Sequence, residues 1–386
     1  MSDIVQDASS GHEDSPAFLP VAPEDQASST ALLAALASGS TPPALMSYRG
    51  AHTLAVLRDR ESELEALLRG TGVFDLGFRS RIEVRGEDRV RWLNGMLTND
   101  VQGLGENEGN YSFVLNAQGR IQGDCQTFRL QDRLILHTDR TQTVPLLAHF
   151  DRFIIMDDVE LRDLSAESTA LGLAGPQAAA TLRALGVDLP AASNEASPVS
   201  GCTIRSVTVG GIAAELIAER IGRVPHFELW VQPEHVSAVW NALMGAGGVP
   251  CGAAPLDALR TLEGIPLYGV DLLERDLSQE ANQPHALNFS KGCYLGQEIV
   301  ERVRSRGSVH RRLVQFTLSS MPAQLPAELT SDGKPAGRLT SATEWQGAVY
   351  AIGIARVEAL EREAALEYGE GTARLLRTSP IGKLRA

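Results

Sequence analysis

The sequence predicts an α+β fold that ends in a small β-barrel. Runs of alternating apolar residues are mixed with helical patterns, but the regular β-α-β spacing of a parallel doubly wound sheet is absent. From residue 311 onward only short strand patterns follow, which favours a terminal barrel. The length of 386 residues, of which 43% are hydrophobic, is enough for two or three packed domains.

Residues 1–45 are rich in Ser, Ala, Pro and acidic residues. The first Lys or Arg is Arg49, so the positive charges of a secretory or mitochondrial signal are missing. Such a segment buries too little apolar surface to offset the cost of ordering its backbone. We therefore expect a mostly disordered acidic tail, in which Thr30–Ala37 forms at most a turn or two of helix.

Residues 46–165 are expected to form a first α+β domain. Its helices are predicted at Leu64–Gly70, Asp88–Leu97 and Thr143–Phe150. Its strands are predicted at Arg81–Arg85, Tyr111–Asn116, Ile121–Leu130, Arg133–Thr138 and Phe153–Leu161. Turn residues at 117–119 and 131–132 join the middle three strands into an antiparallel group.

Residues 166–250 repeat this mixture and predict a second α+β domain. Its strands and helices are expected at Ala170–Ala174, Pro176–Leu185, Cys202–Val209, Ala213–Ala218, Phe227–Val231 and Glu234–Gly245. The segment 251–310 opens with a helix, Pro255–Gly264, that carries leucines on one face. Residues 311–386 form the barrel, with strands at Leu313–Leu318, Gly337–Ser341 and Val349–Val357.

Composition and missing motifs exclude several classes of protein. The net charge of −13 argues against a surface built throughout to neutralise phosphates. The four cysteines contain no C-x-x-C pair, and no apolar run approaches the roughly 20 residues of a membrane span. The sequence also lacks a P-loop, a G-x-S-x-G elbow and an H-E-x-x-H helix. We expect a cytoplasmic protein without membrane contact and without a metal site.

One segment, Lys291–Glu298 (K-G-C-Y-L-G-Q-E), combines a thiol with flanking glycines. Lys291 lies two residues from Cys293 and would lower the pKa of its thiol, which favours a nucleophile, a redox centre or a soft-metal ligand. The alternative is that Cys293 is a small buried hydrophobe and that Lys291 points to water. Five arginines follow, at positions 302, 304, 306, 311 and 312.

This segment resembles the signature of the YgfZ group, folate-binding relatives of the glycine-cleavage T-protein in the aminomethyltransferase-like superfamily. The resemblance continues through Leu259–Asp271, where Leu262 stands at the family's usual Glu and Glu263 follows it. It also includes Ser80–Asp88 and Leu93–Val101, and in all it covers roughly residues 50–360. It implies a three-domain, ring-like T-protein fold whose central hole binds tetrahydrofolate and is lined by residues 251–310, with segments of 250–310 returning to the first domain.

The resemblance places two carboxylates at the folate. Glu228 takes the place of the family's pterin-binding Glu, where a carboxylate accepts an amino group and a ring N–H as a bidentate pair. Its alternative role is a solvent-facing residue on an alternating strand. Asp124 matches the second of two T-protein aspartates that assist proton movement, whereas Gly123 stands at the first. Ile221 replaces a T-protein tyrosine, so binding is better supported than transfer.

The resemblance also implies the other members of the site. Catalytic roles fall on Cys293, Lys291 and Asp124. Folate-binding roles fall on Glu228, Asp124, Arg260, Glu263, Tyr268, Tyr294, Gln297, Glu298 and Arg302. Local ion pairs on a helix, Arg260 with Glu263 and Glu298 with Arg302, are the alternative explanation for four of them.

The function that the resemblance implies is a monomeric, cytoplasmic tetrahydrofolate-binding protein. It would support iron–sulfur cluster assembly or repair, and through it tRNA modification, with iron–sulfur client or assembly proteins as partners. The first alternative is a folate-dependent one-carbon (aminomethyl) transferase. The second is a non-catalytic module with a weak tRNA contact, because six Lys or Arg stand against two Glu between Lys291 and Arg312.

Overall fold

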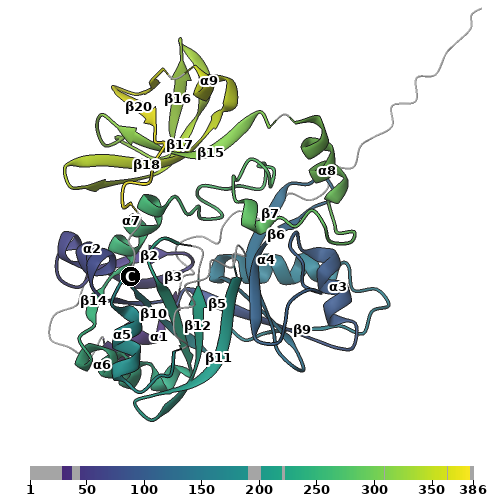
Figure 1. Cartoon of the computed structure of the whole chain (residues 1–386), viewed down its shortest axis with the longest axis vertical. Coiled ribbons are helices and arrows are strands. Elements are labelled where there is room, and N and C mark those ends of the chain that lie inside the picture. Colours follow the sequence, from purple (N-terminus) through teal and green to yellow (C-terminus); the bar gives the residue numbers. More distant parts are fainter. Residues whose placement is uncertain are drawn as a thin grey trace, which may run out of the picture.

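The fold is built around a sheet of eleven strands (Figure 1). The computed structural model describes residues 28–36, 44–189, 201–219, 222–307, 309–362 and 364–382. The strand order of the sheet is β14 (Val249–Cys251), β4 (Gly72–Asp75), β10 (Thr169–Ala174), β13 (His226–Val231), β12 (Ile212–Glu219), β11 (Gly201–Val209), β6 (Glu108–Leu115), β7 (Ile121–Arg129), β8 (Leu134–Asp139), β5 (Arg79–Arg85) and β9 (Glu160–Asp163). The pair β14–β4 is parallel, and the other neighbours are antiparallel.

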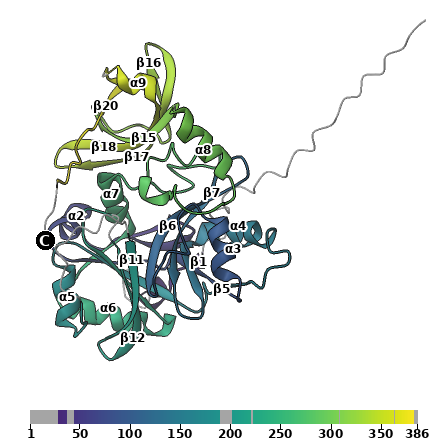
Figure 2. The ribbon, with the colours of Figure 1, turned by 45° about the vertical axis from the view of Figure 1, so that its right-hand side comes forward.

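The sheet has two halves, each with its own helices. One half carries α3 (Arg89–Met96) and α4 (Arg140–Asp151), and the other carries α5 (Ala178–Ala184) and α6 (Val236–Gly245), as Figures 1 and 2 show. The halves join where Gly201–Thr203 of β11 pairs with Glu108–Asn110 of β6. Each half buries an apolar layer between its strands and helices. This arrangement brings β7, β8 and β13 close to the middle of the molecule.

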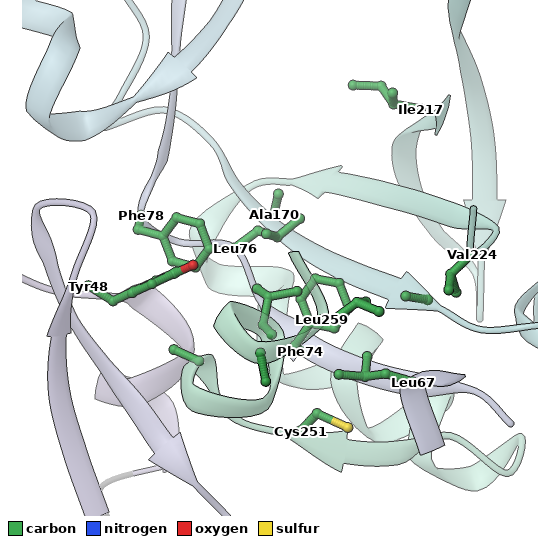
Figure 3. Packing of buried hydrophobic residues seen from close by; sticks show 14 of the residues in the cluster. Tyr48, Leu67, Phe74, Leu76, Phe78, Ala170, Ile217, Val224, Cys251 and Leu259 are labelled. Carbon is green, nitrogen blue, oxygen red and sulfur yellow. The ribbon is translucent and has the colours of Figure 1, made fainter. Parts of the chain in front are cut away.

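A third apolar cluster lies under α7 (Ala253–Glu263) and α2 (Arg60–Arg69). It also takes residues from β2 (Ala44–Tyr48) and β3 (Ala51–Val56), which form a small sheet with β1 (Ser28–Ser29). In Figure 3, Tyr48 lies beside Phe78 and Leu76, and its ring meets that of Phe78 edge-on at 5.0 Å. α7 ends at Gly264, whose φ of 75° is the left-handed conformation that favours glycine after a helix.

The C-terminal part is a closed six-stranded barrel. Its strands, in barrel order, are β15 (Arg311–Leu318), β18 (Ala348–Arg356), β17 (Lys334–Trp345), β16 (Ala327–Ser331), β19 (Leu366–Tyr368) and β20 (Gly371–Leu375). The short helix α9 (Val357–Glu361) follows β18, and the barrel lies against α7 (Figure 1). The α8 helix (Gln297–Arg306) lies between the barrel and the β6–β7 hairpin. Within the described ranges, no helix is long and apolar enough to cross a membrane.

Two expectations from the sequence need correction. Residues 28–36 belong to the expected disordered tail. The short helix α1 (Ala31–Leu36) lies where a turn or two of helix was expected, but it is packed against the fold, and Leu32 is fully buried. Thr30 holds this segment in place, because its hydroxyl donates to Asp75 and its amide donates to the His52 carbonyl oxygen. Residues 1–27 and 37–43 of that tail lie outside the described residues.

The second correction concerns the strand expected at Phe153–Leu161. The chain forms an exposed loop there, with Ile155 83% and Met156 93% exposed, and β9 begins only at Glu160. The loop is fixed by Asp158, whose carboxylate accepts from the Glu87 amide at 2.9 Å and whose own amide donates to Asp88 at 3.0 Å. These bonds turn the chain back before it can pair as a longer strand.

Candidate functional site

A cavity lies where the two halves of the long sheet meet α7. Strands β5, β7 and β8 line it from one half, and β12 and β13 line it from the other. Its walls are formed by Tyr48, Arg49, Leu76, Arg79, Tyr111, Asp124, Cys125, Gln126, His137, Glu219, His226, Glu228, Leu256, Leu259, Arg260, Glu263, Ile265, Pro266, Gln283 and His285. Charged and apolar residues thus share one concave surface, as in sites for small molecules.

Glu228 is the most deeply buried carboxylate of this wall, with only 2% of the residue exposed. The Trp230 indole N–H donates to its Oε2 at 2.7 Å, and the Arg79 Nε lies 3.9 Å from its Oε1. Burial alone would raise the pKa of Glu228, but Arg79 and His137 together lower it well below its usual range. Glu228 is therefore an ionised acceptor at neutral pH.

Arg79 connects this carboxylate to a second one. Its guanidinium contacts Asp139 at 3.3 Å and donates to the Gln126 side-chain oxygen at 3.1 Å. Arg49 reaches the other oxygen of Asp139 at 2.8 Å. The two arginines therefore hold Asp139 in place and leave positive charge beside Glu228.

His137 is fully buried on β8 and lies behind Glu228. Arg81 Nε donates to His137 Nε2 at 3.0 Å, so the neutral ring carries its proton on Nδ1. That Nδ1 lies 3.8 Å from Glu228 Oε2. Burial, with Arg81 nearby, lowers the pKa of His137 to about 3. The ring is therefore neutral near pH 7 and turns an N–H toward the carboxylate.

Asp124 lines the cavity from β7. The Tyr111 hydroxyl donates to its Oδ2 at 2.7 Å, and the Gln142 amide group donates to its Oδ1 at 2.9 Å. Removal from bulk water, and then the charge of Asp139, raise the pKa of Asp124. A carboxyl with a raised pKa that is held by two neutral donors is suited to exchanging a proton with a ligand.

The neighbouring position cannot hold a second carboxylate without rearrangement. A Cβ added to Gly123 would lie 2.8 Å from Leu146 Cδ2 and 2.9 Å from Gln142 Oε1. Both of these side chains belong to α4, which packs on β7. Gly123, where the resemblance implies that an aspartate is missing, is thus covered by a helix.

Arg260 and Glu263 both line the cavity, but they do not pair with each other. Arg260 contacts Asp257 and Asp271 at 2.7 Å each and donates to the Ser341 hydroxyl of the barrel at 2.9 Å. Glu263 instead accepts from backbone amides, at 2.6 Å from residue 223 and 2.9 Å from residue 224. Arg260 therefore joins α7 to the barrel, while burial raises the pKa of Glu263.

Lys291 occupies a different place from the one expected beside a reactive thiol. Its ammonium donates to the backbone carbonyl oxygens of Asn94, Leu97 and Asn99 at 2.6, 2.7 and 2.6 Å. Asn94 and Leu97 lie at the C-terminal end of α3, and Asn99 lies in the turn after it. A cation there satisfies these carbonyls and interacts favourably with the helix dipole. Burial lowers the pKa of Lys291 to about 8. Lys291 therefore caps the C-terminal end of α3, a helix that is distant from it in the sequence.

Among the described residues that line the cavity, none belongs to the rest of the motif. Gly296 has a φ of 82°, and an added Cβ would lie 2.6 Å from the Asn116 carbonyl oxygen in the β6–β7 turn. Tyr294 is buried in an apolar cluster, which Tyr268 also contacts. Cys293 is exposed, and Gln297 begins α8. The glycine is needed for close packing of loop on hairpin.

Three of the five arginines after the motif contact nearby acids. Arg302 pairs with Glu298 at 2.5 Å on the exposed face of α8, which is the local ion pair considered from the sequence. Arg304 contacts Glu301 at 3.5 Å, and Arg311 contacts Glu280 at 2.7 Å. Ile221 and the side chain of Arg306 lie outside the described parts of the chain.

Six charged or polar residues of the cavity were not predicted from the sequence. They are Arg49, Arg79, Tyr111, His137, Glu219 and His226. A signal existed for some of them, because a charged or polar residue in the middle of an otherwise apolar strand needs a buried partner. His137, in the run Leu134–Asp139, is the clearest case. The partner of such a residue depends on which strands pair, and local patterns do not show this.

Comparisons with known proteins agree on one family. A family model described as the GCVT N-terminal domain matches residues 48–291, more than half of the chain. An aminomethyltransferase from Rubrobacter xylanophilus is 30% identical over 325 residues, or 83% of each chain. A protein named putative transferase At1g60990, chloroplastic, from Arabidopsis thaliana is 27% identical over 296 residues, which cover 74% of this chain and 65% of the relative.

A solved structure agrees with the architecture. The glycine cleavage system aminomethyltransferase T from Bartonella henselae matches with a TM-score of 0.77, over 89% of this chain and 95% of that chain, at 20% sequence identity. This likeness confirms the expected α+β T-protein fold with its C-terminal barrel.

Proposed function

Because the chain belongs to the family defined by the GCVT N-terminal domain, we propose that it binds tetrahydrofolate in the central cavity and transfers a one-carbon unit. This was the alternative reading of the sequence, and the aminomethyltransferases among the relatives favour it over the iron–sulfur role. The observation that carries the proposal is Glu228, a buried ionised carboxylate on the cavity wall.

The cavity residues fit a pterin. Glu228 offers two oxygens to a paired amino group and ring N–H, and a charge-assisted pair of this kind is strong and directional. Leu76, Leu256 and Leu259 give the same cavity apolar walls for a flat ring. The buried Arg79 and His137 keep Glu228 ionised, so its carboxyl does not have to lose a proton before it binds the pterin.

Asp124 would supply proton transfer. Bound tetrahydrofolate supplies a nitrogen nucleophile that takes up the one-carbon unit. Asp124 lines the same cavity as Glu228, and its raised pKa suits a group that accepts a proton and later returns it. Tyr111 and Gln142 fix the direction of its two oxygens.

A second candidate is the YgfZ-type role, in which folate binding serves iron–sulfur cluster assembly or repair and through it tRNA modification. Two observations favour it. Position 123 has no carboxylate, and α4 covers the place where one would stand. Cys293 is exposed in the motif loop, outside the cavity, where a partner protein could reach it. In this candidate the cavity binds folate without completing transfer.

Calorimetry with tetrahydrofolate under anaerobic conditions tests the shared step. Replacing Glu228 by Gln keeps the shape but removes the charge, and we expect a loss of about 2–4 kcal/mol, roughly 30- to 1000-fold in affinity. Glu370→Gln, at an exposed position between β19 and β20 of the barrel, is the matched control and should bind as the wild type does. Equal binding by Glu228→Gln and the wild type would contradict the proposal.

Turnover then separates the two candidates. Formation of methylene-tetrahydrofolate from a protein-bound aminomethyl donor or an N-methyl amine would support transfer. Folate binding without any such product would favour the second candidate.

A further inference from the structure

We propose that Glu219, His226 and Glu228 form a binding site for a divalent transition-metal ion inside the cavity, and that this ion competes with tetrahydrofolate for Glu228. The evidence for the metal site is the arrangement of the three side chains and does not depend on folate binding. The competition rests on the proposed folate site, because it requires Glu228 to hold the pterin.

The pairing of β12 with β13 places the three side chains together. Glu219 lies directly opposite His226 in the antiparallel ladder, and Glu228 lies two residues further along β13. Residues two apart on a strand, and residues opposite each other on paired strands, point to the same face of a sheet. The donor atoms of all three lie within 4.8 Å of one another.

The histidine is the second observation that points to a ligand. Its Nε2 is buried, and no hydrogen-bond partner is found for it among the described residues. A buried ring nitrogen without a partner loses its bond to water and gains nothing in return. This residue lines the cavity, so a ligand bound there can satisfy the nitrogen.

Both carboxylates are held by neutral donors. Gln126 donates to Glu219 Oε1 at 2.7 Å, and Trp230 donates to Glu228 Oε2 at 2.7 Å. Each bond fixes one oxygen and leaves the other for a ligand. Hydrogen bonds of this kind orient the ligands of metal ions in proteins.

The donor set selects the kind of ion. One imidazole nitrogen with two carboxylates suits Zn²⁺ and its transition-metal neighbours, whereas Mg²⁺ prefers oxygen ligands only. Three protein ligands leave a coordination position toward the cavity. The Arg79 Nε, 3.9 Å from Glu228, opposes a cation, while the two ligand carboxylates and Glu263, which lines the same cavity from α7, favour it.

The site has no sequence motif, which explains why the sequence predicted no metal. Helical motifs repeat a ligand every four residues, but here two ligands lie on one strand and the third lies on its neighbour. Only the register of the strand pair brings Glu219 to His226.

Calorimetric titration of the chelator-treated full chain with Zn²⁺ tests the site. We expect one ion per chain, and at least about a tenfold loss of affinity in both His226→Ala and Glu219→Gln. His235→Ala, an exposed histidine just after β13, is the control and should match the wild type, and Mg²⁺ should not bind. No Zn²⁺ binding, or equal binding by all variants, would overturn the site.

A second titration uses only the wild type, so it does not depend on how the variants fold. With saturating Zn²⁺ and without oxygen, the apparent affinity for tetrahydrofolate should fall at least tenfold relative to chelator-treated protein. An unchanged affinity would overturn the competition. Absence of folate binding in the chelator-treated protein would instead contradict the proposed function, while the Zn²⁺ titration continues to test the metal site by itself.

Discussion

The Lys291–Glu298 loop has the stronger sequence motif, whereas the central cavity gathers the charged side chains. The loop carries the longest motif, yet its lysine caps α3 and one glycine packs on the β6–β7 turn. The cavity was signalled by isolated residues such as Glu228 and Asp124, yet there the charged groups converge. In this protein, the lysine and one glycine of the long motif pack against other segments, whereas the buried charged groups converge in the cavity.

The largest effect should come from Asp124 in the cavity. If transfer is the function, Asp124→Asn should lower kcat by about 10²–10⁴-fold, the usual contribution of a positioned acid or base. Folate affinity should change little, because the amide keeps the shape and one acceptor for Tyr111. Single-turnover kinetics beside calorimetry measure the two quantities. A loss of affinity with kcat unchanged at saturating folate would show that Asp124 only binds.

Lys291 should affect stability rather than binding. Lys291→Met leaves backbone carbonyls at the end of α3 without a donor, which should cost about 1–3 kcal/mol in the free energy of unfolding. Lys334→Met, an exposed lysine of the barrel, is the control, with an expected change within about 0.5 kcal/mol. Urea unfolding measures both. Normal stability together with a loss of folate binding would show that Lys291 has a role in binding instead.

His137 should make stability depend on pH. Its pKa is about 3 in the fold and 6.5 in the unfolded chain, so between these values the unfolded state binds the extra proton. This contribution is complete above pH 6.5 and is lost as the pH falls, by up to about 1.4 kcal/mol per pH unit. His137→Gln does not titrate and can still accept from Arg81, so its stability should fall less between pH 6.5 and 4.5. Parallel curves from urea unfolding would contradict the buried neutral ring.

The smallest effect on binding should come from Cys293. The thiol is exposed and is not part of the cavity wall as described, so Cys293→Ser should change folate affinity by less than about twofold. The same variant should fail to complement a YgfZ-deficient strain if the second candidate is right. A large loss of folate affinity would mean that the motif loop reaches the ligand.

The sequence by itself determined the kind of fold and most of its elements. Alternating runs such as Phe227–Val231, and the leucine face before Gly264, depend only on neighbours within one strand or helix, so local patterns predict them. The barrel followed from the change in pattern after residue 311. Local patterns misled where an apolar run stays exposed, as at Ile155 and Met156.

The tertiary structure alone decided which side chains meet. Lys291 reaches Leu97, Arg81 reaches His137, and Glu219 faces His226 through contacts that depend on the pairing of distant segments. Burial then sets the chemistry, since removal from water changes the pKa of each group and gives its few neighbours a strong effect. The sequence named Glu228 and Asp124 by resemblance, but their partners and charge states follow from the fold.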